Sequence, residues 1–92
     1  MSDILLVVCR QGATVEDIKH CLDSGDDVNV KGEKGRMPIH YAAHAGSLEV
    51  VQYLISRGAK VNASDDTGMK PIDYAEVKGR TEIVKCLRAS GG

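Results

Sequence analysis

Hydrophobic residues recur at helical spacing in the middle of this chain. Within residues 47–58, SLEVVQYLISRG, the apolar side chains fall on one face of a helix, at Leu48, Val51, Leu54 and Ile55, with Val50 and Tyr53 beside them. The hydroxyl of Ser47 can cap the first turn of this helix, and Gly58 suits its end. The pattern predicts an amphipathic helix whose apolar face packs into a core.

A shorter helix is expected immediately before it. Pro38 suits the first turn of a helix, where a missing N–H costs nothing, and residues 38–45 are dominated by small side chains. Gly46 then separates the two helices. After Gly58, the polar stretch ASDDTG predicts an extended turn or hairpin. Each unit is therefore expected to be a helix, a tight turn, a second helix and a hairpin loop.

The unit repeats after 33 residues. The matched positions are Gly25 with Gly58 and Gly91, Pro38 with Pro71, Tyr41 with Tyr74, Gly46 with Gly79, and Leu54 with Leu87. The offset predicts a helix over 71–78 and another over 82–88, with Thr81 as the cap of the second. A fixed period of this length indicates a stacked array of one helical unit.

We expect one all-α domain over residues 1–92, a solenoid of about three helix-turn-helix units connected by hairpin loops. Its repeats are expected at approximately 1–31, 32–64 and 65–92. The first unit is partial, with helices in residues 3–12 and 13–25. Thr14 is the expected cap of its second helix, and Asp17 takes the capping-box position.

The chain resembles the ankyrin-repeat family. The resemblance rests on GRMPIHYAAHAGSLEVVQYLISRGAKVNASD and GMKPIDYAEVKGRTEIVKCLRASG. These segments follow the family pattern G-x-T-P-L-H-x-A-A, then G-x-x-x-V-V-x-x-L-L-x-x-G-A-D-x-N. Met37 and Lys70 depart from it where Thr is usual, and Asp73 departs where His is usual. The resemblance covers essentially the whole chain and implies a non-enzymatic protein-interaction module without a cofactor.

The resemblance also implies that the partner is another protein. The central repeat is most similar to small free-standing ankyrin proteins that bind and inhibit the actin capping heterodimer, so this heterodimer is the first candidate. The alternative is an ankyrin adaptor with an unrelated partner, such as a transcription factor, a kinase or a ubiquitin ligase subunit. In the third unit, Glu76 and Lys78 stand where the second unit has alanines. We therefore expect that unit to be a polar cap of a small free-standing adaptor.

Partners of stacked repeats bind along the concave face, and in the ankyrin family also at the hairpin tips. The resemblance places the binding surface at two successive junctions between repeats. The predicted protein-binding residues are Glu33, Lys34, Arg36 and His44 at the first junction, and Asp66, Thr67, Met69, Val77 and Lys78 at the second. Arg36, His44 and Met69 are the strongest single candidates, since Arg and Met are enriched at interfaces. Tyr41 and Tyr74 are expected deeper, between the repeats.

His40 and His44 raise a different reading, a metal site. They are four residues apart, a spacing that puts both on one helix face and that occurs in zinc sites. The resemblance implies instead that His40 makes a structural hydrogen bond between hairpin loops and that His44 faces the partner. The next unit carries Asp73 and Val77 at these positions. We expect no metal site, and a metal-binding protein or thiol enzyme is the alternative from another class.

Two further sets of residues have structural readings. Cys9, Cys21 and Cys86 fall at or near apolar helical positions and are expected to be buried as small hydrophobic residues. Asp65 and Asp66 lie in a loop, where acidic side chains are usually solvated.

Composition and charge narrow the range of partners. The formal net charge is −1 and no basic stripe is present, which argues against nucleic acid. No apolar run approaches the roughly 20 residues of a membrane-spanning helix. The cysteines form no CxxC pair, and the amino-terminal sequence lacks the pattern of a signal peptide. We expect a monomer in the cytoplasm, with the nucleus as a second candidate compartment.

Overall fold

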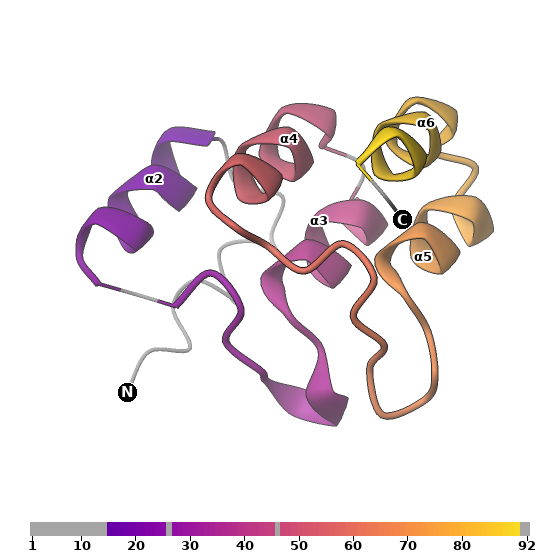
Figure 1. The fold of residues 1–92 in the computed structure, drawn as a ribbon, viewed down its shortest axis with the longest axis horizontal. Helices are drawn as coiled ribbons and strands as arrows, with labels where there is room; N and C mark the ends of the chain where they lie inside the picture. The colour runs from indigo at the N-terminus through magenta and orange to yellow at the C-terminus, as the bar shows by residue number, and fades with distance from the viewer. Residues whose placement is uncertain (1–14, 26, 46, 91–92) are drawn as a thin grey trace.

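The computed structural model describes residues 15–25, 27–45 and 47–90, which form helices joined by turns and loops (Figure 1). The elements are α2 (Val15–Asp23), the short 3-10 turn η1 (Glu33–Gly35), α3 (Pro38–Ala45), α4 (Leu48–Ser56), α5 (Pro71–Val77) and α6 (Thr81–Ala89). Over these described ranges no β-strand is formed. The helix expected in residues 3–12 and the cap expected at Thr14 lie outside the described residues.

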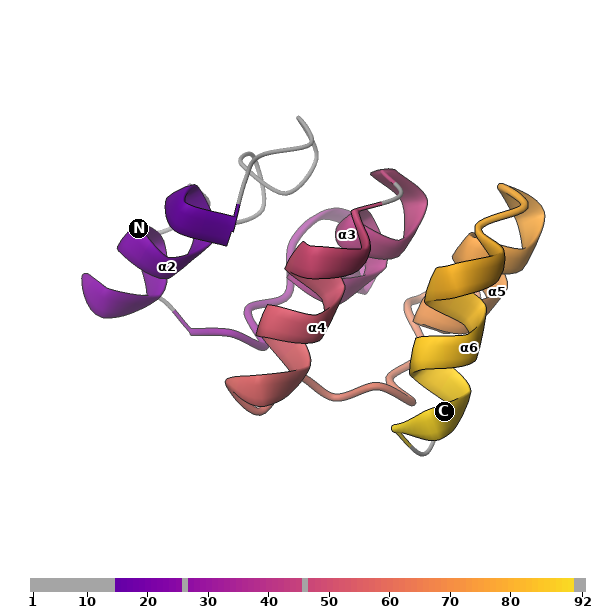
Figure 2. The ribbon, with the colours of Figure 1, turned by 90° about the horizontal axis from the view of Figure 1, so that it is seen from above.

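The helices form two layers (Figure 2). Helices α2, α4 and α6 lie side by side in an outer row, where α2 packs on α4 and α4 packs on α6. Helices α3 and α5 form the inner row and contact each other, and each also contacts the outer helix of its own repeat. The loops extend away from the helices on one side (Figure 1). The predicted all-α helical solenoid is confirmed.

The core is made by the apolar faces that the periodicity predicts. Ile18, Ile39, Val51, Leu54 and Leu87 are completely buried. Alanines of the inner helices fill the space between the rows, because small side chains let the helix backbones approach closely; the buried ones are Ala42, Ala43 and Ala75. Cys21 is buried as expected, Cys86 is half-buried against the same core, and Cys9 lies outside the described residues.

The first helices of the second and third repeats start at Pro38 and Pro71 as predicted, whereas the predicted cap of the second helix is right in one repeat and wrong in the other. The hydroxyl of Ser47 accepts a hydrogen bond from the backbone N–H of Val50, as expected of a cap. In the third repeat Thr81 is already inside α6, and the predicted cap is wrong by one residue. The carbonyl of Arg80 accepts the first helical hydrogen bond, from Val84, so the arginine occupies the cap position. The 33-residue offset itself places Arg80 opposite Ser47.

The two hairpin loops close with the same backbone hydrogen bonds. The N–H of Gly32 donates to the carbonyl of Arg36 at 2.8 Å, and 33 residues later the N–H of Asp65 donates to the carbonyl of Met69 at 2.9 Å. The tips also bind each other, because the N–H of Asp66 donates to the carbonyl of Lys34 at 2.8 Å. These bonds set the spacing between the repeats and hold the inner-helix surface in register.

Candidate functional site

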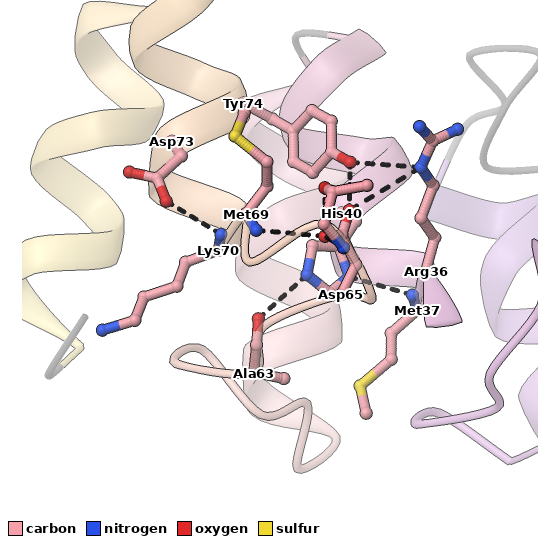
Figure 3. A network of polar contacts seen from close by, with 10 residues as sticks. Arg36, Met37, His40, Ala63, Asp65, Met69, Lys70, Asp73 and Tyr74 are labelled. Atoms are coloured by element: carbon pink, nitrogen blue, oxygen red, sulfur yellow. Dashed lines mark hydrogen bonds and ion pairs between the residues drawn. The ribbon is translucent and has the colours of Figure 1, made fainter. Parts of the chain in front are cut away.

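His40 fastens its own helix start to the next hairpin loop. Its Nδ1 accepts a hydrogen bond of 2.9 Å from the backbone N–H of Met37, so Nε2 carries the proton and donates to the carbonyl of Ala63, also at 2.9 Å (Figure 3). The side chain is almost fully buried. Burial lowers the pKa of His40, which stabilises the neutral form that this geometry requires. The predicted structural role of His40 agrees with these contacts.

In the third repeat, a carboxylate makes the first of these two hydrogen bonds, the one at the start of the helix. Asp73 stands where the second repeat has His40, and Lys70 stands where it has Met37. The Oδ2 of Asp73 accepts a hydrogen bond of 2.9 Å from the backbone N–H of Lys70 (Figure 3). The departure from the family pattern at Asp73 therefore preserves the hydrogen bond at the helix start.

Asp65 is buried, contrary to the expectation that it is solvated. Its side chain has no exposed surface. Its Oδ1 accepts hydrogen bonds from the backbone N–H and the hydroxyl of Thr67, at 2.9 and 2.6 Å, and from the N–H of Met69 at 3.0 Å. Its Oδ2 accepts one from the hydroxyl of Tyr74, and the guanidinium Nε of Arg36 lies 3.7 Å away (Figure 3). The carboxylate thereby organises the second hairpin and ties it to the start of α3.

The electrostatics of this cluster favour an ionised carboxylate. Burial acts to raise the pKa of Asp65, but hydrogen bonds from Thr67, Tyr74 and the Met69 backbone outweigh it and hold the pKa well below its usual range. Burial, together with the hydrogen bond to Asp65, raises the pKa of the Tyr74 hydroxyl. Asp65 therefore stays charged and Tyr74 stays protonated over the whole neutral pH range.

Sequence reasoning missed this cluster for two reasons. The 33-residue offset places Gly32 opposite Asp65, so the comparison of repeats gives no sign that the carboxylate is structural. The burial also depends on Arg36 and Tyr74, which come from different repeats. The one local signal is the run Asp65-Asp66-Thr67-Gly68, since an Asp two residues before a Thr commonly accepts the hydrogen bonds of an Asx turn.

A concave pocket of about 170 Å³ opens next to this cluster. It is lined by Arg36, His40, Tyr41, His44 and Tyr74. The ring of Tyr74 stands edge-on to the rings of His40 and His44, with centroid distances of 5.7 and 6.2 Å. Tyr74 is half-buried between the repeats, as expected, and forms the floor shared by α3 and α5. We use the name inner-helix groove for this pocket together with Val77, which follows Tyr74 by three residues on α5, and with Lys78 and Arg80, whose charges act on His44.

The structure distributes the predicted binding residues over the groove and the hairpin tips. Exposed residues are Lys34, Asp66 and Thr67 at the tips and His44, Val77 and Lys78 on the inner helices. Arg36 and Met69 are only partly exposed. The guanidinium Nε of Arg36 also donates to the Tyr74 hydroxyl at 3.1 Å, so part of its side chain has a structural role. Glu33 begins η1, beside Lys34, whose backbone is left-handed with a φ of 58°.

His44 lies in positively charged surroundings. Partial burial lowers the pKa of its imidazole, and the charges of Lys78, Arg36 and Arg80 lower it further. These cations come from the segment before α3 and from the turn between α5 and α6. His44 and Lys78 are among the predicted binding residues, whereas Arg80 is not, because its effect on His44 depends on the contact between α3 and α5.

The paired histidines do not form a metal-binding pair. Both ring nitrogens of His40 are engaged with backbone groups, so the lone pair needed for a metal bond is already used. In the part of the chain that the structure describes, no group of three or more His, Cys, Asp or Glu side chains is arranged to hold a metal ion. Among the described helices, none has both the length and the apolar character needed to cross a membrane.

Comparison with known families identifies the class of this chain. A family model described as ankyrin repeats, in three copies, matches residues 5–92. The chain therefore belongs to the ankyrin-repeat family. Ankyrin repeats are protein–protein interaction modules that are generally non-catalytic. A search among curated proteins finds no significant match.

Proposed function

We propose that this chain binds another protein through the inner-helix groove and the adjoining hairpin tips. The observation that carries the proposal is the exposure of Val77. Among the described residues it is the large hydrophobic side chain that is left exposed, at 73 %. It lies on the inner helix α5, three residues after Tyr74, and the ring of Tyr74 lines the pocket together with His44. An exposed apolar side chain close in sequence to a pocket lined by aromatic rings supports a contact with a partner.

The finer proposal is a partner of the kind that myotrophin binds. Residues 25–65, GDDVNVKGEKGRMPIHYAAHAGSLEVVQYLISRGAKVNASD, resemble the sequence of myotrophin, a small ankyrin protein that binds and inhibits the actin capping heterodimer. This chain is one repeat shorter. We therefore propose a myotrophin-like, non-enzymatic regulator that acts as a monomer in the cytoplasm, where actin and its capping protein meet.

The test is a titration against the purified actin capping heterodimer, with growth of actin filaments at their barbed ends measured in parallel. One-to-one binding that restores growth of capped filaments is the expected result. A failure to bind at high micromolar protein would overturn the capping-protein proposal and favour an adaptor with an unrelated partner. Gel filtration of the free protein tests whether it is a monomer. Fluorescence microscopy of the tagged chain in cells tests whether it lies in the cytoplasm.

A further inference from the structure

The inner-helix groove carries two cations, Lys78 and Arg80, that form no ion pair with another described residue. Partial burial lowers the pKa of the His44 imidazole, and the charges of Lys78, Arg36 and Arg80 lower it further. Arg36 is already paired through its Nε with the buried carboxylate of Asp65. The two described carboxylates that line pockets with Arg80 pair with other cations, Glu76 with Arg88 at 3.5 Å and Glu82 with Lys85 at 4.0 Å. The groove is therefore locally positive although the chain as a whole has a formal net charge of −1.

Arg36 is held in a suitable position to receive an anion. Its Nε is fixed between the Tyr74 hydroxyl at 3.1 Å and Asp65 at 3.7 Å. Its two terminal nitrogens point away from that carboxylate (Figure 3), and 32 % of the side chain is exposed. A guanidinium presents a fork of donors that matches the two oxygens of a carboxylate. Because the side chain is already ordered, little rotamer entropy is lost on binding.

An apolar surface adjoins these cations. Val77 follows Tyr74 by three residues on α5, so the two side chains lie on the same face of the helix. Lys78 comes next in the chain, at the end of α5, and Arg80 follows in the turn before α6. An occupant of this groove would meet a hydrophobic contact point at Val77 that is followed directly by positive charges.

We propose that the inner-helix groove binds an acidic peptide segment of the partner protein, with one carboxylate on Arg36 beside His44, a second on Lys78 and Arg80, and an apolar side chain on Val77. This inference rests on the proposed function, since it names the chemistry of the segment that enters the groove. The positive charge is local to the groove. It therefore determines where the partner's acidic residues dock, and not only whether the partner binds.

Binding of this segment is coupled to protonation of His44. The described titratable and charged groups around its ring are Arg36 from the loop, His40 and Tyr41 from α3, Tyr74 from α5, and Lys78 and Arg80 from the turn after α5. In the free protein these cations favour the neutral imidazole. A bound carboxylate favours the charged imidazole, so the complex takes up a proton and the affinity increases as the pH falls below the ordinary value of 6.5.

The probe is a fluorescein-labelled decapeptide rich in glutamate with one central leucine, and a peptide with glutamine in place of glutamate is the control ligand. The groove variant combines Lys78→Glu with Arg80→Glu. A matched control combines Lys19→Glu with Lys85→Glu, which makes the same change in net charge at exposed positions of the outer helices. Circular dichroism verifies that both variants are folded.

Fluorescence anisotropy should show that the groove variant binds the acidic peptide about tenfold more weakly, and the control variant within about twofold of the wild type. Replacing His44 by Ala should abolish the increase in affinity below pH 6.5. Equal weakening by both variants would overturn the inference, because it would show a general charge effect. Tighter binding of a labelled single-stranded oligonucleotide than of the peptide would also overturn it.

The control peptide separates this inference from the proposed function. If the glutamine peptide binds as tightly as the glutamate peptide and only the groove variant loses it, the groove is a binding site but the acidic segment is wrong. If neither peptide distinguishes the groove variant from the outer-helix control, while the capping heterodimer still binds the wild type, the partner uses another surface and both proposals for the groove are wrong.

Discussion

Replacing Asp65 by Ala is predicted to be among the most destabilising single changes in the described part of this protein. The substitution removes the acceptor for two backbone N–H groups, for the Thr67 hydroxyl and for the Tyr74 hydroxyl. It also leaves Arg36 without the carboxylate that lies 3.7 Å from its Nε. All these groups lie where the second hairpin meets α3 and α5, so the change loosens the contact between two repeats.

The magnitude follows from the number and type of these contacts. A hydrogen bond to a charged group contributes about 1.5–3 kcal/mol, and loss of one partner of a buried ion pair costs about 3–5 kcal/mol, but such terms are not additive. Arg36 is partly exposed and water can solvate it again, which places the expected loss near the lower end, at about 3 kcal/mol. For a domain of this size the melting temperature should fall by about 15 °C.

Urea unfolding followed by circular dichroism measures the free energy directly. Asp65→Asn keeps an oxygen toward Thr67 and Met69 but loses the charge that faces Arg36. Its free energy of unfolding should therefore fall by about half as much as that of Asp65→Ala. Asp66→Ala is the matched control, because this neighbouring carboxylate is exposed, and it should leave the stability close to that of the wild type. If Asp65→Ala and Asp66→Ala have the same small effect, the role assigned to the buried carboxylate is refuted.

Three further predictions concern the histidines and the link between repeats. In a His44→Gln background, the free energy of unfolding should decrease as the pH falls below 6.5, because the unfolded chain binds a proton at His40 more readily than the folded chain does. It should decrease again below about pH 4, where the unfolded chain protonates Asp65 before the folded chain does. A flat urea-unfolding profile between pH 7 and 5 would contradict the role assigned to His40. His40→Ala should cost about 2–3 kcal/mol in urea unfolding, whereas His44→Ala should change stability little; equal effects would refute the division of roles. Asn29→Ala should cost about 1–2 kcal/mol, because the side chain accepts from the Lys60 N–H and donates to the Gly58 carbonyl; a loss no larger than that of an exposed asparagine would count against this link.

The parts of the fold that depend on local sequence could be predicted. The helix over 38–45 begins and ends as expected, because Pro38 sets its first turn and the change to Gly46 follows its last residue. The Ser47 cap is confirmed, and the apolar period of α4 correctly identifies Val51 and Leu54 as core residues. The repeat period extended these assignments to α5 and α6.

What could not be predicted depends on contacts between repeats or on their register. The Asx-turn run after Asp65 signals its bonds to Thr67, but the contacts with Arg36 and Tyr74 come from two different repeats and leave no local signal. The cap of α6 was misplaced because Thr81 is the better capping residue chemically, whereas the backbone register puts Arg80 there without a side-chain cap. The predicted binding surface stays a prediction, although the structure shows that its residues Arg36 and Thr67 also support the hairpin.

The residues of the groove therefore fall into a structural set and an exposed set. Asp65, His40 and the Nε of Arg36 hold the hairpins and inner helices at a fixed spacing. His44 and Val77 are exposed, and we propose that they contact a partner. A rigid groove favours binding because few groups need to be ordered when the partner arrives.

The most direct test of the account is the affinity of the purified capping heterodimer for three forms of this protein. These are the wild type, a groove variant with Val77→Ser and Lys78→Glu, and the outer-helix control with Lys85→Glu. The account predicts that the wild type and the outer-helix control bind equally and that the groove variant binds at least about tenfold more weakly. Equal binding by all three forms, or no binding by the wild type, would contradict it.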